Sequence, residues 1–580
     1  MRSLLPLSLL LLLAASPLSL RAAGLEELIG EHNADRRDLH ASALVPWSLE
    51  SMDREEMQVQ EWLRRLDMLD YAPLDATARI DWHLLHTQLV ERHDELSLSR
   101  HQLDEMQPLL AFAAPVQQLL KERAQRHLAD PEAAATALAR CLADLKAQRK
   151  PGKNDNTPPP SAVLALRTAG AIDELRTGLA AWYGLYDGFQ PEFNWWVSKP
   201  YEELTKEMAS YSGYLRKDLA GQKGEPGDPL VGDPIGAEAI RSSLAAEMIP
   251  YTAEELIAIA EKQFAWCEAE MTKAAHDLGC ASGPEAVAKI KDHHAPPGGQ
   301  AAFALSEAQK AIAFVKDHDL VTIPPLVEET WGIAMLGPEQ QKSLPYAVYG
   351  QPRIMVAYAA ESMTHEDKLE SMRGNNAAFL HIVTPHELIP GHHLQGFMAR
   401  RYAAYRSSFY TPFLVEGWAL HWEMLLWDQG YVATPEEKVG ALFWRMHRCA
   451  RIITTLKFHL GQMTPAQMID FLVDRVGHER SGATSEVRRY IGGSYGPLYQ
   501  VAYMTGGLQL GALQREICRQ NEDGSPAPAT NGIQRQRATL REFHDAVLKE
   551  GPVPIEMIRA ALRHDELPKE WKPAWRFADS

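Results

Sequence analysis

Apolar residues recur every three or four positions through most of the chain, and this spacing places them on one face of an α-helix. Three stretches show the pattern clearly: EEMQVQEWLRRLDML, ARIDWHLLHTQLVERHDEL and PEAAATALARCLADLKAQ. Clusters of Pro and Gly interrupt it near residues 150–161, 221–236, 293–299 and 521–532, where surface loops are expected. The pattern therefore predicts a mainly α-helical protein.

One interval, from Ser343 to Pro385, departs from the helical spacing. It contains two runs, LPYAVYGQPRIMVAYAA and NNAAFLHIVTP, which are rich in β-branched and aromatic residues and bounded by turn formers. Both runs predict strands of a small β-sheet directly upstream of residue 386. An edge strand at that place could hold a peptide backbone by strand addition.

Composition describes an ordinary folded protein, with 46% hydrophobic and 23% charged residues in a chain of 580. The formal net charge is -17, and no long run of Lys or Arg interrupts the acidic balance. Because such a surface repels phosphates, nucleic acid is not expected as a partner. The five cysteines are scattered and odd in number, so they predict neither a disulfide framework nor a cysteine-based zinc site.

Residues 1–23 begin with a basic residue, continue as an apolar run and end in small residues, which is the layout of a secretory signal peptide. Pro and Ser residues interrupt a run that is already short for a spanning helix. We therefore expect an exported protein, periplasmic or secreted, with no stable membrane span after cleavage of the signal.

The stretch HELIPGHHLQ, from His386 to Gln395, contains the main chemical signal. A zinc-binding helix usually carries H-E-x-x-H, because histidines four apart share one face and the Glu reaches a metal-bound water. Here the fifth residue is Pro390, and the next histidines are His392 and His393. On a regular helix His392 points about 120° away from His386, and His393 lies about 10 Å further along the axis.

Pro390 and Gly391 stand where a regular helix would have to deform. Pro390 has no N–H to donate to the carbonyl of His386, and Gly391 tolerates backbone conformations that other residues resist. A bulge of two residues would bring His392 beside His386, and a bulge of three would bring His393. The smaller distortion favours His392 as a metal ligand and leaves His393 as a neighbour or substitute.

Glu387 has two interpretations. In an H-E-x-x-H arrangement it is the general base that takes a proton from water. Thr384 is an N-cap candidate with Pro385 at the first helical position, so a helix is expected to begin there. As an alternative to the role of base, Glu387 completes a T-x-x-E capping box by binding the backbone of Thr384.

A third protein ligand is needed beside an open position for water. In FLVEGWALHWE, Glu416 and Glu423 are seven residues apart and share one face of a predicted helix. Glu416 lies in an apolar, aromatic segment, so burial is expected, and a buried carboxylate needs a partner. Glu416 is therefore the candidate third ligand, and Glu423 the candidate acceptor for the second nitrogen of a ligand imidazole.

The segments HELIPGHHLQ, EGWALHWE, EVRRYIGG, PLYQVAYMTGG and FHDAVLKEGPVP together resemble the bacterial family known as domain of unknown function eight-eight-five. That family is grouped with the gluzincin metallopeptidases, which include carboxypeptidase Taq and thimet oligopeptidase. The resemblance implies one large helical catalytic domain over residues 24–580, with a deep cleft that two lobes could flank. It also implies Zn²⁺ bound by His386, His392 and Glu416, with Glu387 as general base.

The resemblance extends to a tyrosine that stabilises the oxyanion in related helical peptidases. The resemblance assigns that role to Tyr503. Tyr499, which stands where the family has Gln, is the alternative candidate. Both could instead be tyrosines packed in the core. Arg489, in EVRRY, could bind a substrate carboxylate through a bidentate fork or serve as the structural partner of Glu486.

These residues lead to the hypothesis of an exported zinc-dependent hydrolase, most simply a peptidase acting on a peptide or small amide. Two alternatives remain at this stage. The Pro-Gly insertion could have removed catalysis and left a periplasmic binding or scaffold protein with the inherited fold, or the same zinc chemistry could act on non-peptide amides or esters.

Overall fold

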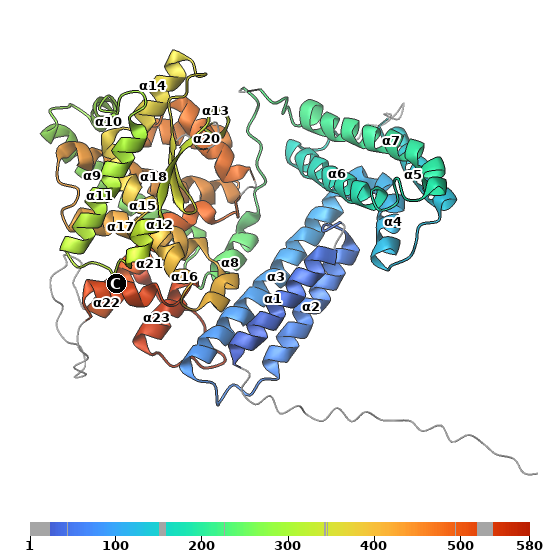
Figure 1. Cartoon of the computed structure of the whole chain (residues 1–580), viewed down its shortest axis with the longest axis horizontal. Coiled ribbons are helices and arrows are strands. Elements are labelled where there is room, and N and C mark those ends of the chain that lie inside the picture. Colours follow the sequence, from blue (N-terminus) through green and yellow to red (C-terminus); the bar gives the residue numbers. More distant parts are fainter. Residues whose placement is uncertain are drawn as a thin grey trace, which may run out of the picture.

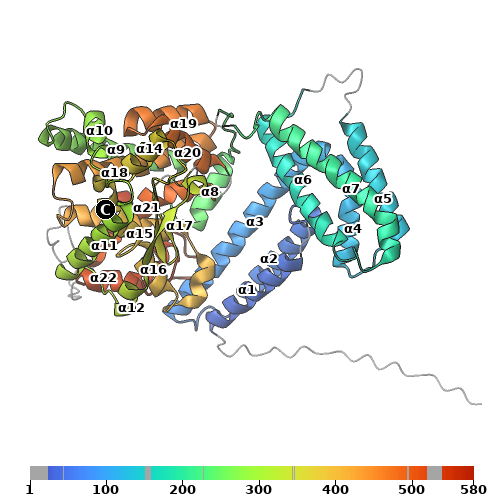
Figure 2. The same cartoon turned by 45° about the horizontal axis from the view of Figure 1, so that its top comes forward.

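The computed structural model describes residues 24–42, 45–149, 158–225, 227–341, 344, 346–492, 495–518 and 538–579. Its helices bury two large apolar cores, and the long helix α3 (Ala76–Leu110) contributes to both. Side chains from Ile80 to Leu89 belong to the larger core, and those from Leu96 to Leu110 to the smaller one. Figures 1 and 2 show α4–α7 standing to one side of the remaining helices, with α3 bridging the two groups.

We call residues 96–220 the module and the part enclosing the larger core the body. Beside α3 run α1 (Leu25–Ser42) and α2 (Leu49–Asp67). The module contains α4 (Ala114–Ala124), α5 (Pro131–Gln148), α6 (Ala162–Tyr183) and α7 (Pro191–Tyr214). The body continues with α8 (Gly236–Ala246), α9 (Ala253–Asp277), α10 (Gly283–Lys291), α11 (Gln300–Asp317), α12 (Pro325–Thr330), α13 (Pro338–Gln341), α14 (His365–Gly374), α15 (Ala377–Glu387), α16 (His392–Ala399), α17 (Pro412–Asp428), α18 (Pro435–His459), α19 (Pro465–Phe471), α20 (Arg480–Ile491), α21 (Tyr499–Cys518), α22 (Leu540–Val547) and α23 (Ile555–Arg563). Short 3-10 or π segments are η1 (Ala111–Ala113), η2 (Leu215–Leu219), η3 (Ala404–Phe409), η4 (Leu472–Val476) and η5 (Phe577–Asp579).

The mainly α-helical class predicted from the apolar spacing is confirmed. The three quoted stretches lie in helices, apart from Met68 and Leu69 at the end of the first, and α5 covers PEAAATALARCLADLKAQ from its first residue to its last. Asp130 explains where α5 begins, because its side chain accepts a hydrogen bond from the backbone N–H of Ala133 and Pro131 follows it. The segments 221–235 and 293–299 lie between helices as expected, whereas residues 1–23, 150–157 and 519–537 lie outside the described part of the chain.

The small sheet contains β1 (Gly332–Leu336), β2 (Ala347–Gly350) and β3 (Arg353–Ala357) in the order β1-β3-β2. β1 pairs with β3 in parallel and β2 pairs with β3 antiparallel, so β2 is an edge strand. The first predicted run, LPYAVYGQPRIMVAYAA, supplies β2 and β3. The sheet lies within the body, next to the helices that carry HELIPGHHLQ.

The second predicted strand, NNAAFLHIVTP, is wrong, because its residues from Ala377 onward lie in α15. Asn376 caps this helix by accepting a hydrogen bond from the N–H of Phe379, and the following residues are buried on all sides. A short run that is apolar all round has no periodicity to separate a strand from a buried helix. The helix start predicted at Thr384 is also wrong, because Thr384 lies inside α15, which begins at Ala377. Glu387 is the last residue of α15 and does not cap it.

Among the helices of the described residues, none is both long enough and apolar enough to cross a membrane.

Candidate metal centre

The segment Leu388–Gly391 separates α15 from α16, so HELIPGHHLQ spans two helices rather than one bulged helix. Within this break, the N–H of Gly391 donates to the carbonyl of Pro385 at 2.9 Å. A Cβ atom at Gly391 would lie 1.8 Å from the carbonyl oxygen of His386. Glycine is therefore required because two stretches of backbone approach closely, and its φ of -77° is not left-handed.

This break brings His392, and not His393, to His386. The ring centroids of His386 and His392 are 4.9 Å apart with perpendicular planes. His393 points the other way: its Nδ1 lies 3.1 Å from the hydroxyl of Tyr349, and its Nε2 lies 3.0 Å from the carbonyl of Val327. Both nitrogens of His393 are thus engaged away from the centre.

A close crossing of α17 and α21 positions the third candidate ligand, Glu416. A Cβ on Gly417 would lie 2.6 Å from the backbone of Gly506, and a Cβ on Gly506 would lie 1.9 Å from the carbonyl oxygen of Phe413. At this crossing, Oε2 of Glu416 lies 3.3 Å from Nε2 of His392 and 3.8 Å from Nε2 of His386. Its other oxygen accepts a hydrogen bond from the hydroxyl of Tyr499. The hydroxyl of Tyr499 is therefore committed to Glu416.

These donors fit a zinc ion. Nitrogen and oxygen ligands of a tetrahedral zinc, each about 2.0–2.1 Å from the metal, lie roughly 3.3 Å from one another. The separation of Glu416 from His392 matches that value, and its separation from His386 is longer. Within the described residues, Oε2 of Glu416 is buried and has no well-aligned hydrogen-bond partner. His386, Glu387 and His392 also each offer one atom within 4.8 Å of the others.

Glu423 contacts the Nδ1 side of His386, which is the position predicted for an acceptor of the second imidazole nitrogen. Its Oε1 lies 2.6 Å from Nδ1 of His386 and 3.3 Å from Nη2 of Arg448. A carboxylate at Nδ1 fixes the proton there and leaves Nε2 free to act as a ligand.

The pKa values of Glu387 and Glu416 shift in opposite directions. Burial raises the pKa of Glu387, although the charges of His386 and His392 act against it. Burial also acts to raise the pKa of Glu416, yet His392 and His386 hold that pKa well below its usual range. For His386, burial lowers the pKa, but the nearby carboxylates of Glu416 and Glu423 outweigh this effect and raise the pKa to about 9. Such a divergence suits Glu416 as a fixed anion and Glu387 as a group that exchanges a proton.

A cavity of about 320 Å³ opens beside this centre. Tyr503 lines it with its ring centroid 6.4 Å from that of His386, and burial raises the pKa of its hydroxyl. The edge strand β2 lines the cavity through Ala347, Val348 and Tyr349. The predicted site residues therefore share one cavity, apart from His393, which points away, and Glu423, which lies behind His386.

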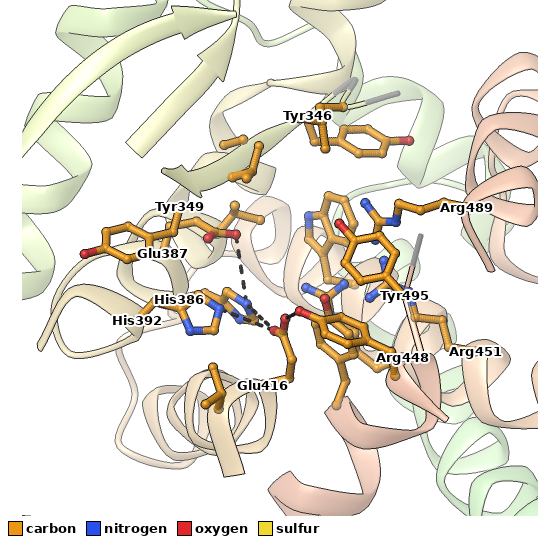
Figure 3. A pocket seen from close by; sticks show the side chains of 18 of the residues that line it. Tyr346, Tyr349, His386, Glu387, His392, Glu416, Arg448, Arg451, Arg489 and Tyr495 are labelled. Carbon is orange, nitrogen blue, oxygen red and sulfur yellow. Dashed lines mark hydrogen bonds and ion pairs between the residues drawn. The ribbon is translucent and has the colours of Figure 1, made fainter. Parts of the chain in front are cut away.

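Three arginines form another wall of the cavity: Arg448 and Arg451 from α18 and Arg489 from α20 (Figure 3). Arg489 lies 3.7 Å from the buried Glu486, the partner considered for it above. Arg448 and Arg451 were not predicted. The signal was present in RMHRCARIITT, where charged residues three apart interrupt an otherwise apolar helix.

The chain belongs to the family of bacterial proteins of unknown function designated DUF885, whose model matches residues 28–562. The resemblance read from the motifs is confirmed at this level.

Two solved structures share the fold. One is described as a putative lipoprotein of unknown function from Shewanella oneidensis, with 17% identity, a TM-score of 0.68, and coverage of 93% of this chain and 100% of that one. The other is described as the putative lipoprotein from Colwellia psychrerythraea, with 15% identity, a TM-score of 0.55, and coverage of 93% of this chain and 97% of that one. A search of curated proteins gives no match.

Proposed function

We propose that this protein is an exported zinc-dependent hydrolase of peptide bonds. The observation that carries the proposal is the convergence of His386, His392 and Glu416 beside Glu387, from three helices, at one end of a cavity. When bound, zinc supplies Lewis acidity and makes water nucleophilic at neutral pH. Export rests on the N-terminal pattern of residues 1–23 and on the two related structures, both described as putative lipoproteins.

The protein's own residues divide the work. His386, His392 and Glu416 hold the ion, and Glu423 holds Nδ1 of His386 so that Nε2 is the nitrogen that faces it. Glu387 accepts a proton from the attacking water and returns it to the leaving amine, a role that its raised pKa favours. Tyr503 donates a hydrogen bond to the developing oxyanion.

The edge strand β2 supports a peptide as the substrate. Its outer edge is unpaired within the sheet, and three of its residues line the cavity. An extended peptide can add to such an edge through main-chain hydrogen bonds. These bonds would position the amide of the peptide whatever its side chains are.

The test is the substitution Glu387→Gln, which keeps the side-chain shape and removes the base. We expect about one tightly held zinc per chain in both proteins, with peptide hydrolysis reduced by about 10²–10⁴-fold in the variant. Metal analysis and release of amine from a peptide library, with and without a chelator, measure the two quantities. Full activity in the variant contradicts the assignment of the base, and absence of zinc after purification in its presence contradicts the metal centre.

A further inference from the structure

The guanidinium groups of the cavity wall are not fully compensated by carboxylates. Arg448 pairs with Glu423 at 3.3 Å, and Arg451 pairs with Glu486 at 2.9 Å. For Arg489, Glu486 is also the partner, at 3.7 Å, and its Oε2 is the same atom that Arg451 already binds. Three cations thus share two carboxylates, and the wall retains one positive charge. A buried charge of this kind is costly unless a counter-charge meets it.

Arg489 is the member of this wall that is best placed to meet a ligand. Its side chain is 19% exposed, against 6% for Arg448 and 3% for Arg451. Its Nε is buried and makes no hydrogen bond among the described residues, and the same holds for Nη1 of Arg451. Figure 3 shows the arginines across the cavity from His386 and His392.

We propose that Arg489, backed by Arg451, binds a carboxylate of the substrate, and that Glu486 is a positioning residue for both. This inference rests on the proposed function. The planar guanidinium presents paired N–H donors that match a carboxylate in two parallel hydrogen bonds. The bound carboxylate supplies the negative charge that the wall lacks.

The size of the cavity indicates what kind of substrate carries this carboxylate. A volume of about 320 Å³ lies at the low end for ligand pockets and suits a short segment of chain. With the anion at Arg489 and the metal centre on the other side, the scissile amide lies close to the carboxylate. The substrate class is therefore short peptides with a carboxylate beside the bond that is cut, either the C-terminus itself or an acidic side chain.

The experiment measures binding of three pools of acetylated tetrapeptides to zinc-loaded protein in the Glu387→Gln background, which keeps the peptides intact. The pools have free C-termini, amidated C-termini, or amidated C-termini ending in Glu. We expect the free acids to bind about 10–100-fold more tightly than the plain amides, as hydrogen bonds to a charged group allow. Tight binding of the Glu amides would identify a side-chain carboxylate as the ligand.

Arg489→Gln should abolish the preference for free acids over amides. Arg489→Lys should keep part of it, because lysine has the positive charge but not the paired N–H donors of the guanidinium. Arg488→Gln is the matched control, since Arg488 is the adjacent arginine and is exposed; it should retain the full preference. Circular dichroism and zinc content of each variant report on folding. Equal affinity for all three pools in the parent, an unchanged preference in Arg489→Gln, or no binding of any pool overturns the proposal.

Different results would contradict the proposed hydrolase and the proposed carboxylate subsite. Carboxylate-selective binding without hydrolysis by the parent protein keeps the anion subsite and removes the hydrolase. Zinc-dependent hydrolysis that ignores the carboxylate and is unchanged in Arg489→Gln keeps the hydrolase and removes the subsite.

Discussion

In the module, the buried side chains are almost all apolar, and Thr168 and Ser212 are the buried polar residues among residues 96–220 of the described chain. The body, by contrast, encloses histidines, carboxylates and guanidinium groups around one cavity. Burying such groups costs free energy unless each finds a partner, whereas an apolar core carries no such penalty. The contrast separates a region with an apolar interior from a region whose interior contains ionisable groups that each need a partner.

The largest expected effect that distinguishes the two regions is acid destabilisation of the body. Burial lowers the pKa of His83 and His544 to about 4 and that of His478 to about 3, all in the body. An unfolded His titrates near 6.5, so this contribution to stability is fully present above that pH and is lost as the pH falls toward 4. Summed over the three residues, the loss is on the order of several kcal/mol.

Hydrogen exchange measured at pH 7 and pH 5 tests this expectation region by region. Protection of the body should fall, while protection of the module should change little, because its histidines His101 and His127 are exposed. Equal loss in both regions would show that the buried histidines are not the cause.

The next effect is confined to the module. Phe193 is completely buried in its core, and Phe193→Ala should destabilise the module by about 3–5 kcal/mol through lost burial and a cavity. Trp195→Ala on the same helix is the control, because Trp195 is 85% exposed and its loss should cost no more than about 0.5 kcal/mol. Denaturant dependence of exchange in the module reports both values. Loss of zinc from Phe193→Ala would mean that the two regions are more tightly coupled than their separate cores indicate.

A smaller effect is expected at the crossing that positions Glu416. Gly506→Ala places a Cβ against the carbonyl of Phe413 and should cost about 1–3 kcal/mol, with weaker zinc binding as α17 and α21 separate. Gly511→Ala on the same helix is its control, since its nearest neighbour is the side chain of Arg515 at 3.7 Å, and alanine there should be neutral or stabilising. Zinc affinity from chelator competition, together with thermal melting, measures both effects. Equal zinc affinity and equal thermal stability of the two variants would show that the close crossing of α17 and α21 does not position Glu416.

The sequence predicted the helical class, the strands β2 and β3, and the residues that meet at the centre, because each leaves a local pattern. It did not predict that Ala377–Pro385 is helical, since a segment buried on every side has no periodicity to read. The break at Leu388–Gly391 was expected only as a bulge, because the contact between Gly391 and the carbonyl of His386 depends on how the backbone turns. Arg448 and Arg451 were missed because their meeting with Arg489 depends on how α18 packs against α20.

Helix α3 also bears on the order in which the protein can fold during synthesis. The core of the module uses residues from Val45 to Ala220, so the module can assemble as soon as that part of the chain emerges. The first half of α3 must wait, because the hydroxyl of Tyr71 and the ring of His83 beside it bind the carbonyls of Leu567 and Pro568, almost the whole chain later. The two ends of α3 therefore reach their final contacts at different times, the second half early in synthesis and the first half only after residues 567–568 have emerged.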